Sequence, residues 1–297
     1  MELCLGTVQF GMDYGVFEQP KKDPDYCIKC LDYATQNGID AIDTAAAYGI
    51  AEEITGNFLK LKTVPRDRLF LSTKLMPNIL DEQDPSEYFR IIKERLEGSL
   101  RTLHTDYVDV YYLHSSRYAF NDDILAALER VCETGLARKV GVSVYYPEEA
   151  FACFESGKVS YIQAPYSIFD HRMKESGIFV KAEDAGYGID VRTAFIKGLI
   201  RLSENEIPGH LVKAKPILRR LDAICSETGW SRIDLALGYI KREKQIGHIV
   251  FGIRDLGQLK EDIASFGKEI PDEIFDMIDK EFSGIDASLV IPSLWKK

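Results

Sequence analysis

Four side chains that can hold or move a proton stand at or just beyond the ends of three strand-like segments. Asp43 lies near the end of one apolar run and Tyr48 on the loop that follows it, while Lys74 ends a second run and His114 a third. If the three strands are parallel neighbours, their carboxyl ends share one edge of the sheet, which is where parallel α/β folds place their chemistry. We therefore expect the four side chains to converge.

Together, these residue types suit the protonation of a carbonyl oxygen while a hydride reaches the carbonyl carbon. A tyrosine ionises near pH 10, and we expect the ammonium of Lys74 to lower the pKa of Tyr48 and make it a better acid. Asp43 would keep Lys74 charged, because a buried ammonium without a partner is costly. His114 could donate an N–H to the same oxygen. Taken singly, each residue also fits a structural role: a turn cap, a packed tyrosine, a solvated strand end or a core histidine.

The segments that must position these residues alternate between strand-like and helix-like patterns. Most of the strand-like runs are continuously apolar, as in a parallel sheet covered by helices. Eight β-α units in one chain predict a closed (β/α)8 TIM barrel, which we expect to form a single domain over residues 1–297. The alternative is an open doubly wound sheet, but the Gly6 to Gly11 segment after the first strand lacks the G-x-G-x-x-G of that fold. The predicted strands are 3–8, 41–44, 69–74, 108–114, 139–144, 161–165, 189–193 and 249–252.

Helix signals lie between and after these strands. Asp84, Pro85 and Glu87 form a helix-start signature, followed by apolar residues at steps of three and four from Phe89 to Leu103. After the seventh strand, the pattern predicts a mostly polar loop and then three late helices. The loop is expected over 198–215 and the helices over 216–228, 232–243 and 271–282.

Composition narrows the class of protein. The 297 residues carry 47 acidic and 37 basic side chains, for a net charge of −10, which argues against general binding to nucleic acid. The chain begins without signal-peptide features, and no apolar run approaches the length needed to cross a membrane. Cys27 and Cys30 form a C-x-x-C without the further ligands of a zinc site, so we expect reduced cysteines, no metal and a cytoplasmic location. No obligate protein partner is indicated.

Five separated motifs, in order and at matching spacing, resemble the aldo-keto reductase family. They are LGTVQFG at 5–11, GIDAIDTAAAYG at 38–49, RDRLFLSTK at 66–74, TDYVDVYYLH at 105–114 and KVGVSV at 139–144. The resemblance implies a (β/α)8 barrel that binds NADPH without a Rossmann motif and reduces an aldehyde or ketone. It also implies that Asp43, Tyr48, Lys74 and His114 form the catalytic tetrad, with Tyr48 as the proton donor.

The same resemblance implies a cofactor site. Ser143 and Gln163 would hydrogen-bond the nicotinamide carboxamide, and Arg254 would pair with the 2′-phosphate of NADPH. Asp262 stands where many relatives have asparagine, and its carboxylate would repel that phosphate. We expect NADPH to be preferred over NADH because of Arg254, and we expect the charge of Asp262 to weaken this preference. The full set of expected cofactor residues is Gly6, Thr7, Asp43, Ser143, Gln163, Arg192, Thr193, Phe195, Lys197, Gly198, Gly252, Arg254, Gln258, Glu261 and Asp262.

The substrate is expected to be a small carbonyl compound. Tyr14, Tyr48, Met76 and His114 are the predicted pocket residues, and their mixture of aromatic and polar surface suits a sugar-like carbonyl. Two other functions fit the same resemblance. One is a nucleotide-binding regulatory subunit with little turnover, and the other is an aldose or polyol dehydrogenase that works in the oxidative direction.

Overall fold

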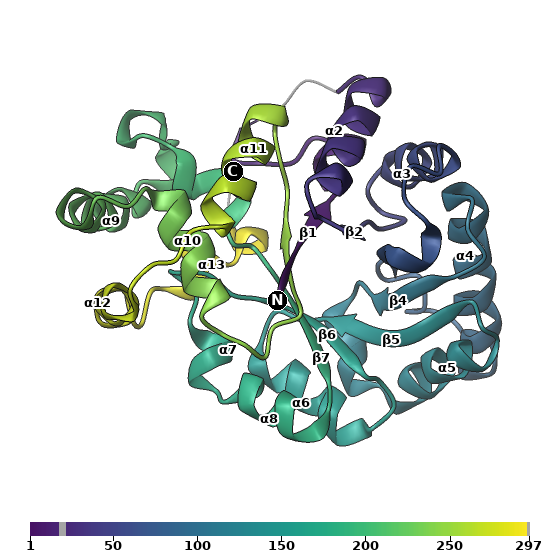
Figure 1. Cartoon of the computed structure of the whole chain (residues 1–297). Coiled ribbons are helices and arrows are strands. Elements are labelled where there is room, and N and C mark those ends of the chain that lie inside the picture. The colour runs from purple at the N-terminus through teal and green to yellow at the C-terminus, as the bar shows by residue number, and fades with distance from the viewer. Residues whose placement is uncertain (18–21, 296–297) are drawn as a thin grey trace.

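Eight parallel strands close into a barrel in the computed structural model, which describes residues 1–17 and 22–295 (Figure 1). Each strand pairs with the next along the chain, and the eighth pairs with the first, where Glu2 lies opposite His248. This confirms the predicted TIM barrel. The strands are β1 (Glu2–Gly6), β2 (Ala41–Asp43), β3 (Phe70–Leu75), β4 (Val108–Leu113), β5 (Ala137–Ser143), β6 (Tyr161–Pro165), β7 (Gly188–Arg192) and β8 (His248–Phe251).

The strand boundaries fall within two residues of the predicted ones. Two of these small differences concern the catalytic candidates Lys74 and His114. Lys74 is the last residue but one of β3, and His114 lies just beyond β4 and not within it. Both residues remain at the carboxyl ends of neighbouring strands, so the predicted convergence is unaffected.

Helices surround the strands, and Figure 1 shows α2 to α6 following one another round the outside. Asp84 caps the predicted helix start by accepting a hydrogen bond from the Ser86 amide at 2.9 Å, although the first turn is a 3-10 helix. The principal helices are α1 (Val8–Gly11), α2 (Pro24–Gln36), α3 (Ala51–Lys60), α4 (Tyr88–Leu103), α5 (Asp122–Glu133), α6 (Pro147–Ser156), α7 (Arg172–Glu175), α8 (Ile178–Ala185), α9 (Ala214–Thr228), α10 (Arg232–Lys241), α11 (Leu256–Phe266), α12 (Asp272–Phe282) and α13 (Ala287–Val290). No helix among the described residues is long and apolar enough to cross a membrane.

The segment predicted as a polar loop at 198–215 is more ordered than expected. It contains most of η4 (Ile196–Arg201), followed by η5 (Glu204–Glu206) and η6 (Gly209–Leu211). Four of its apolar residues, Leu199, Ile200, Ile207 and Leu211, are buried, whereas Val212 is exposed. These contacts hold the segment against the barrel beside the strand ends. The three late helices that the sequence predicts correspond to α9, α10 and α12.

Side chains from the strands themselves fill the amino-terminal end of the barrel. The rings of Phe70 and His248 lie 4.2 Å apart between centroids, and Tyr161 lies 6.3 Å from Phe70. Above them, the fully buried Asp190 accepts a hydrogen bond from the Tyr112 hydroxyl at 2.7 Å and lies 2.7 Å from Nδ1 of His248. The barrel interior therefore has an aromatic layer with one buried carboxylate at this end, opposite the candidate site.

We expect the Tyr112→Phe variant to be less stable than the wild type. The change leaves one oxygen of Asp190 without its donor, and losing a hydrogen bond to a charged group costs about 1.5–3 kcal/mol. The free energy of unfolding from urea titrations measures this. Tyr107→Phe is the control, because that hydroxyl accepts its bond from the exposed Arg138 side chain. Equal stability of the two variants would contradict the role assigned to Asp190.

Candidate active site

A buried ion pair between Asp43 and Lys74 forms the centre of the candidate site. The Lys74 ammonium lies 2.5 Å from one carboxylate oxygen of Asp43 and 2.7 Å from the other, and it also donates to the Thr44 carbonyl at 3.0 Å. Lys74 is fully buried and Asp43 is 2% exposed. Burial alone would lower the pKa of Lys74, but the Asp43 carboxylate and Tyr48 outweigh it and raise that pKa. Lys74 is therefore charged at neutral pH.

Further donors fix the position of the Asp43 carboxylate. Ser72 and Gln163 donate to the same carboxylate oxygen at 2.8 and 2.9 Å. Thr7 donates to the backbone carbonyl of Asp43 from both its amide and its hydroxyl. Ser72 lies two residues before Lys74 on β3, so one strand supplies two of the groups. Neither Ser72 nor this use of Thr7 is predicted by the sequence.

Tyr48 lies above the ion pair on the loop after β2. The Lys74 ammonium is 5.1 Å from the centroid of its ring and interacts with its hydroxyl. Two glycines allow this loop to pack closely: a Cβ on Gly11 would lie 1.7 Å from the Tyr48 carbonyl oxygen, and Gly49 has a φ of 58°. Larger residues at either position would displace the loop that carries Tyr48.

The pKa of Tyr48 differs from the sequence-based expectation. Lys74 lowers it as predicted, but burial of the phenol has the larger effect, and the pKa is raised above its ordinary value. The expectation was wrong in sign because the depth of the site outweighs one neighbouring charge. Tyr48 is thus a fully protonated phenol in the free protein, with a cation placed to stabilise the phenolate once the proton has left.

His114 completes the group. Its ring stands edge-on to that of Tyr48, with centroids 5.6 Å apart and planes at 83°. Burial, followed by the positive charges of Lys74 and Arg192, lowers the pKa of His114 to about 4, and its buried Nδ1 has no hydrogen-bond partner. The imidazole is therefore neutral at physiological pH and suited to donating a hydrogen bond, not a proton.

A cleft runs from Tyr48 across the ends of β1, β7 and β8, and it is lined by four cationic side chains: Arg192, Lys197, Arg201 and Arg254. A cluster of cations in a protein of net charge −10 attracts an anionic ligand. Most of the predicted cofactor residues line this cleft, namely Gly6, Asp43, Gln163, Arg192, Thr193, Phe195, Lys197, Gly198, Gly252, Arg254 and Gln258. Thr7, Ser143, Glu261 and Asp262 do not, although Ser143 is paired with Gln163 in adjacent strands.

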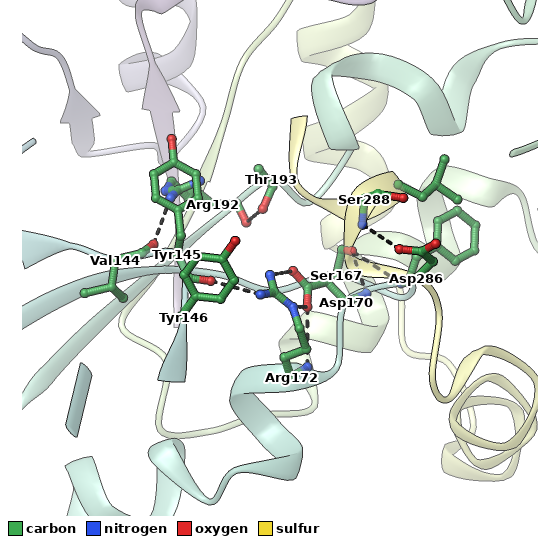
Figure 2. Close-up of polar contacts among 12 residues, drawn as sticks. Val144, Tyr145, Tyr146, Ser167, Asp170, Arg172, Arg192, Thr193, Asp286 and Ser288 are labelled. Carbon is green, nitrogen blue, oxygen red and sulfur yellow. Dashed lines mark hydrogen bonds and ion pairs between the residues drawn. The ribbon is translucent and has the colours of Figure 1, made fainter. Parts of the chain in front are cut away.

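Arg192 is held in place at the end of β7. Its guanidinium donates to the Val144 carbonyl at 2.8 Å and lies 4.3 Å from the centroid of the Tyr145 ring, as Figure 2 shows. Arg172 supports this loop from the other side: it donates to the Tyr145 carbonyl at 3.1 Å and pairs with Asp170 at 2.7 Å (Figure 2). Among the residues that the structure describes, no carboxylate pairs with Arg192, so its charge faces the cleft uncompensated.

The chain after Arg192 makes an unusual turn along the cleft. Thr193, Ile196, Lys197 and Gly198 all have positive φ, between 46° and 88°. Three of these are not glycine, and a β-branched residue such as Ile196 is strained in this region. Such strain clusters at functional sites. The sequence identifies the segment by resemblance alone and gives no sign of its backbone conformation.

Asp262 and Arg201 form a pair that the sequence does not predict. Asp262 is fully buried on α11, and Arg201, at the end of η4, forms ion pairs with both Asp262 and the neighbouring Glu261. Burial raises the pKa of Asp262 to about 7, while Arg201 opposes that rise. The carboxylate that was expected to oppose a 2′-phosphate thus has an ion-pair partner of its own. Like Ser72, Arg201 is a site residue that the sequence does not predict, because only the fold brings it to Asp262.

The predicted substrate residues divide between two places. Tyr14 and Tyr48 line the cleft; Met76 and His114 do not, and Met76 is 40% exposed beyond β3. The Lys197 ammonium lies 4.8 Å from the centroid of the Tyr14 ring and 5.9 Å from that of Trp295. The carboxyl-terminal Trp295 therefore reaches the mouth of the cleft, a placement that the sequence leaves open.

Known proteins resemble this chain over most of its length. The uncharacterized oxidoreductase YrpG of Bacillus subtilis is 27% identical over 95% of this chain and 92% of that protein. The NADH-specific methylglyoxal reductase of Escherichia coli is 25% identical over 84% of this chain and 85% of its own. The holo form of aldo-keto reductase AKR11C1 from Bacillus halodurans superposes with a TM-score of 0.75 at 24% identity, covering 94% of this chain and 91% of that one, a likeness of fold.

A family model gives the same result. The model of the Aldo/keto reductase family matches residues 2–281, which include all four members of the predicted tetrad and the whole cleft apart from Trp295 at its mouth. We conclude that this chain belongs to the aldo/keto reductase family of oxidoreductases.

Proposed function

We propose that this protein is an NADPH-dependent oxidoreductase that reduces an aldehyde or ketone to an alcohol. The observation that carries this proposal is the convergence of the buried Asp43 and Lys74 with the partly buried Tyr48 and His114 beside a cationic cleft. Lys74 is charged, Tyr48 is a protonated phenol and His114 is neutral. These are the protonation states that proton donation to a carbonyl oxygen requires.

The charged and hydrogen-bonding side chains that line the cleft suit a nicotinamide dinucleotide. Arg192, Lys197 and Arg254 supply the positive charge that phosphates need, and Arg is suited to binding a phosphate through two parallel hydrogen bonds. Gln163 uses its side-chain amide nitrogen on Asp43, which leaves its carbonyl oxygen to accept a bond from a carboxamide. The bound cofactor would supply the hydride to the carbonyl carbon.

The residues of the chain handle the proton. Tyr48 gives its phenolic proton to the carbonyl oxygen as negative charge develops there, and the ammonium of Lys74 stabilises the resulting phenolate. His114 donates an N–H to the same oxygen and fixes the orientation of the carbonyl. Asp43 positions Lys74 and offsets the cost of burying its charge. The proton that leaves Tyr48 is replaced from solvent after the alcohol departs.

The preference for NADPH over NADH is supported by Arg254. Its side chain is 59% exposed at the edge of the cleft, and its backbone amide is held by the Gln258 side chain at 2.8 Å. A permanently charged guanidinium in this position can pair with a phosphate monoester on the ribose. A relative named as NADH-specific makes this preference a point that needs direct measurement.

We expect Tyr48→Phe to lower the rate of carbonyl reduction by about a hundredfold or more, because a general acid contributes that much to the rate. The affinity for NADPH should change little, since the ring is kept. Consumption of NADPH with a panel of aldehydes measures turnover, and quenching of protein fluorescence measures binding. Tyr107→Phe, on the outside of the barrel, is the control. Full activity of Tyr48→Phe would refute the assignment of the proton donor, and a wild type that binds NADPH without turnover would favour a regulatory subunit.

Arg254→Ala should weaken NADPH binding by about tenfold or more, the effect of losing a charge-assisted contact, and should change NADH binding by much less. The dissociation constants of both nucleotides, measured at one salt concentration, test this. Lys260→Ala removes an exposed cation from α11, the helix that begins just after Arg254, and serves as the control. If Arg254→Ala weakens both nucleotides equally, Arg254 does not contact the 2′-phosphate.

We expect a small hydroxylated aldehyde to be a better substrate than an aromatic one. The mouth of the cleft combines the ring of Tyr14 with the polar ends of Gln9 and Lys197, a mixture that suits a sugar-like carbonyl. Comparison of kcat/KM for erythrose, glyoxal-type aldehydes and benzaldehyde tests the expectation. A clear preference for benzaldehyde would overturn it.

A further inference from the structure

Arg201 connects the two walls of the cleft at the end where Arg254 lies, which we call the nucleotide end. From the end of η4 its guanidinium reaches α11, where one terminal nitrogen pairs with Glu261 and the other with Asp262. The guanidinium carbon lies 4.7 Å from the centroid of the Phe195 ring. Only 15% of the side chain is exposed, whereas the Arg254 side chain is 59% exposed. Arg201 is therefore fixed in place, while Arg254, whose ion pair with Asp255 is long at 3.6 Å, keeps most of its side chain accessible to a ligand.

Asp262 depends on Arg201. Its carboxylate is completely buried, and one oxygen has no hydrogen-bond partner. Among the described side chains, Arg201 alone donates to the other oxygen. A buried carboxylate that loses its ion-pair partner is strongly unfavourable, and its field spreads further in a poorly solvated region than at the surface. Arg201 thus limits the negative potential that Asp262 creates at this end of the cleft.

Acidic and basic side chains are present in similar numbers at the nucleotide end of the cleft. Glu206 lines the cleft, Asp255 and Glu261 line the hollow that adjoins it, and Asp262 lies behind them. Three arginines line the cleft or the hollow beside these carboxylates: Arg201, Arg254 and Arg232, and Arg232 is already paired with Asp222. If Arg201 were removed, the buried Asp262 would take up a proton, because burial already raises its pKa to about 7, whereas the half-exposed Glu261 would stay charged and lose its partner.

We propose that Arg201 determines the cofactor preference: by neutralising Glu261 and Asp262, it allows Arg254 to hold the 2′-phosphate that distinguishes NADPH from NADH. This inference rests on the proposed function, since it presupposes a nicotinamide dinucleotide in the cleft. Arg201 acts here as a positioning residue, through the carboxylates of α11 and not by contact with the reacting atoms. Burial, which raises the pKa of Asp262 to about 7, is consistent with a carboxylate whose charge is costly at this position.

The Arg201→Met variant tests this inference through the ratio of two dissociation constants. We expect the Kd of NADPH to rise about tenfold more than that of NADH, because only NADPH carries the extra phosphate that the uncompensated Glu261 carboxylate repels. Adding Glu261→Gln and Asp262→Asn to Arg201→Met should restore most of the lost preference. Arg90→Met is the control for losing an arginine that bridges two carboxylates. Arg90 is more exposed than Arg201 and pairs with Glu87 and Glu94 at the start of α4, so its loss should leave the ratio unchanged.

A second variant keeps the inference testable if Arg201→Met does not fold. Glu261→Gln alters an exposed side chain and leaves the buried pair intact, and it should tighten NADPH binding relative to NADH. Equal changes for both nucleotides in Arg201→Met, or an unchanged ratio in Glu261→Gln, would overturn the role of Arg201 while leaving the proposed function standing. A wild-type protein that binds neither nucleotide would instead refute the proposed function.

Discussion

The buried ion pair between Asp43 and Lys74 is the interaction on which the rest of the site depends. An isolated ammonium in the barrel interior would lose its proton, and an isolated carboxylate would gain one. Here both charges persist because each compensates the other, and because Ser72, Gln163 and Thr44 complete their hydrogen bonds. A fixed positive charge therefore exists in a place that excludes water, which is the condition for stabilising a phenolate on Tyr48.

Both ends of the barrel help to hold this positive charge in a fixed place away from water. Adjacent parallel strands bring Asp43, Ser72 and Lys74 together, and close packing of glycine-containing loops sets Tyr48 above them. At the opposite end, aromatic rings and the hydrogen-bonded Asp190 fill the interior, so the polar site is supported by a packed layer. The loops after β7 and β8 then add a cationic wall without altering the proton-handling residues. Under the proposed function, chemistry and cofactor recognition would therefore occupy separate loops on one frame.

Much of this arrangement could be predicted from the sequence, because it depends on local patterns. Continuous apolar runs specify buried parallel strands, and residues at the ends of those strands must share one rim, which is why the convergence of Asp43, Lys74 and His114 was predictable. Properties set by the whole fold were not. The pKa of Tyr48 depends on how deeply the phenol is buried, and the partner of Asp262 lies 61 residues earlier in the chain. The strained turn at Ile196 likewise has no signature in residue types.

A double-mutant cycle on Asp43 and Lys74 is the most direct test of the claim that this ion pair organises the site. Asp43→Asn, Lys74→Met and the double variant would be compared for the free energy of unfolding and for the rate of carbonyl reduction. Each single variant should lose about 3–5 kcal/mol, because it leaves a buried charge unpaired, and the double variant should regain much of that loss while remaining inactive. Additive losses of stability, or turnover that survives Lys74→Met, would contradict the claim.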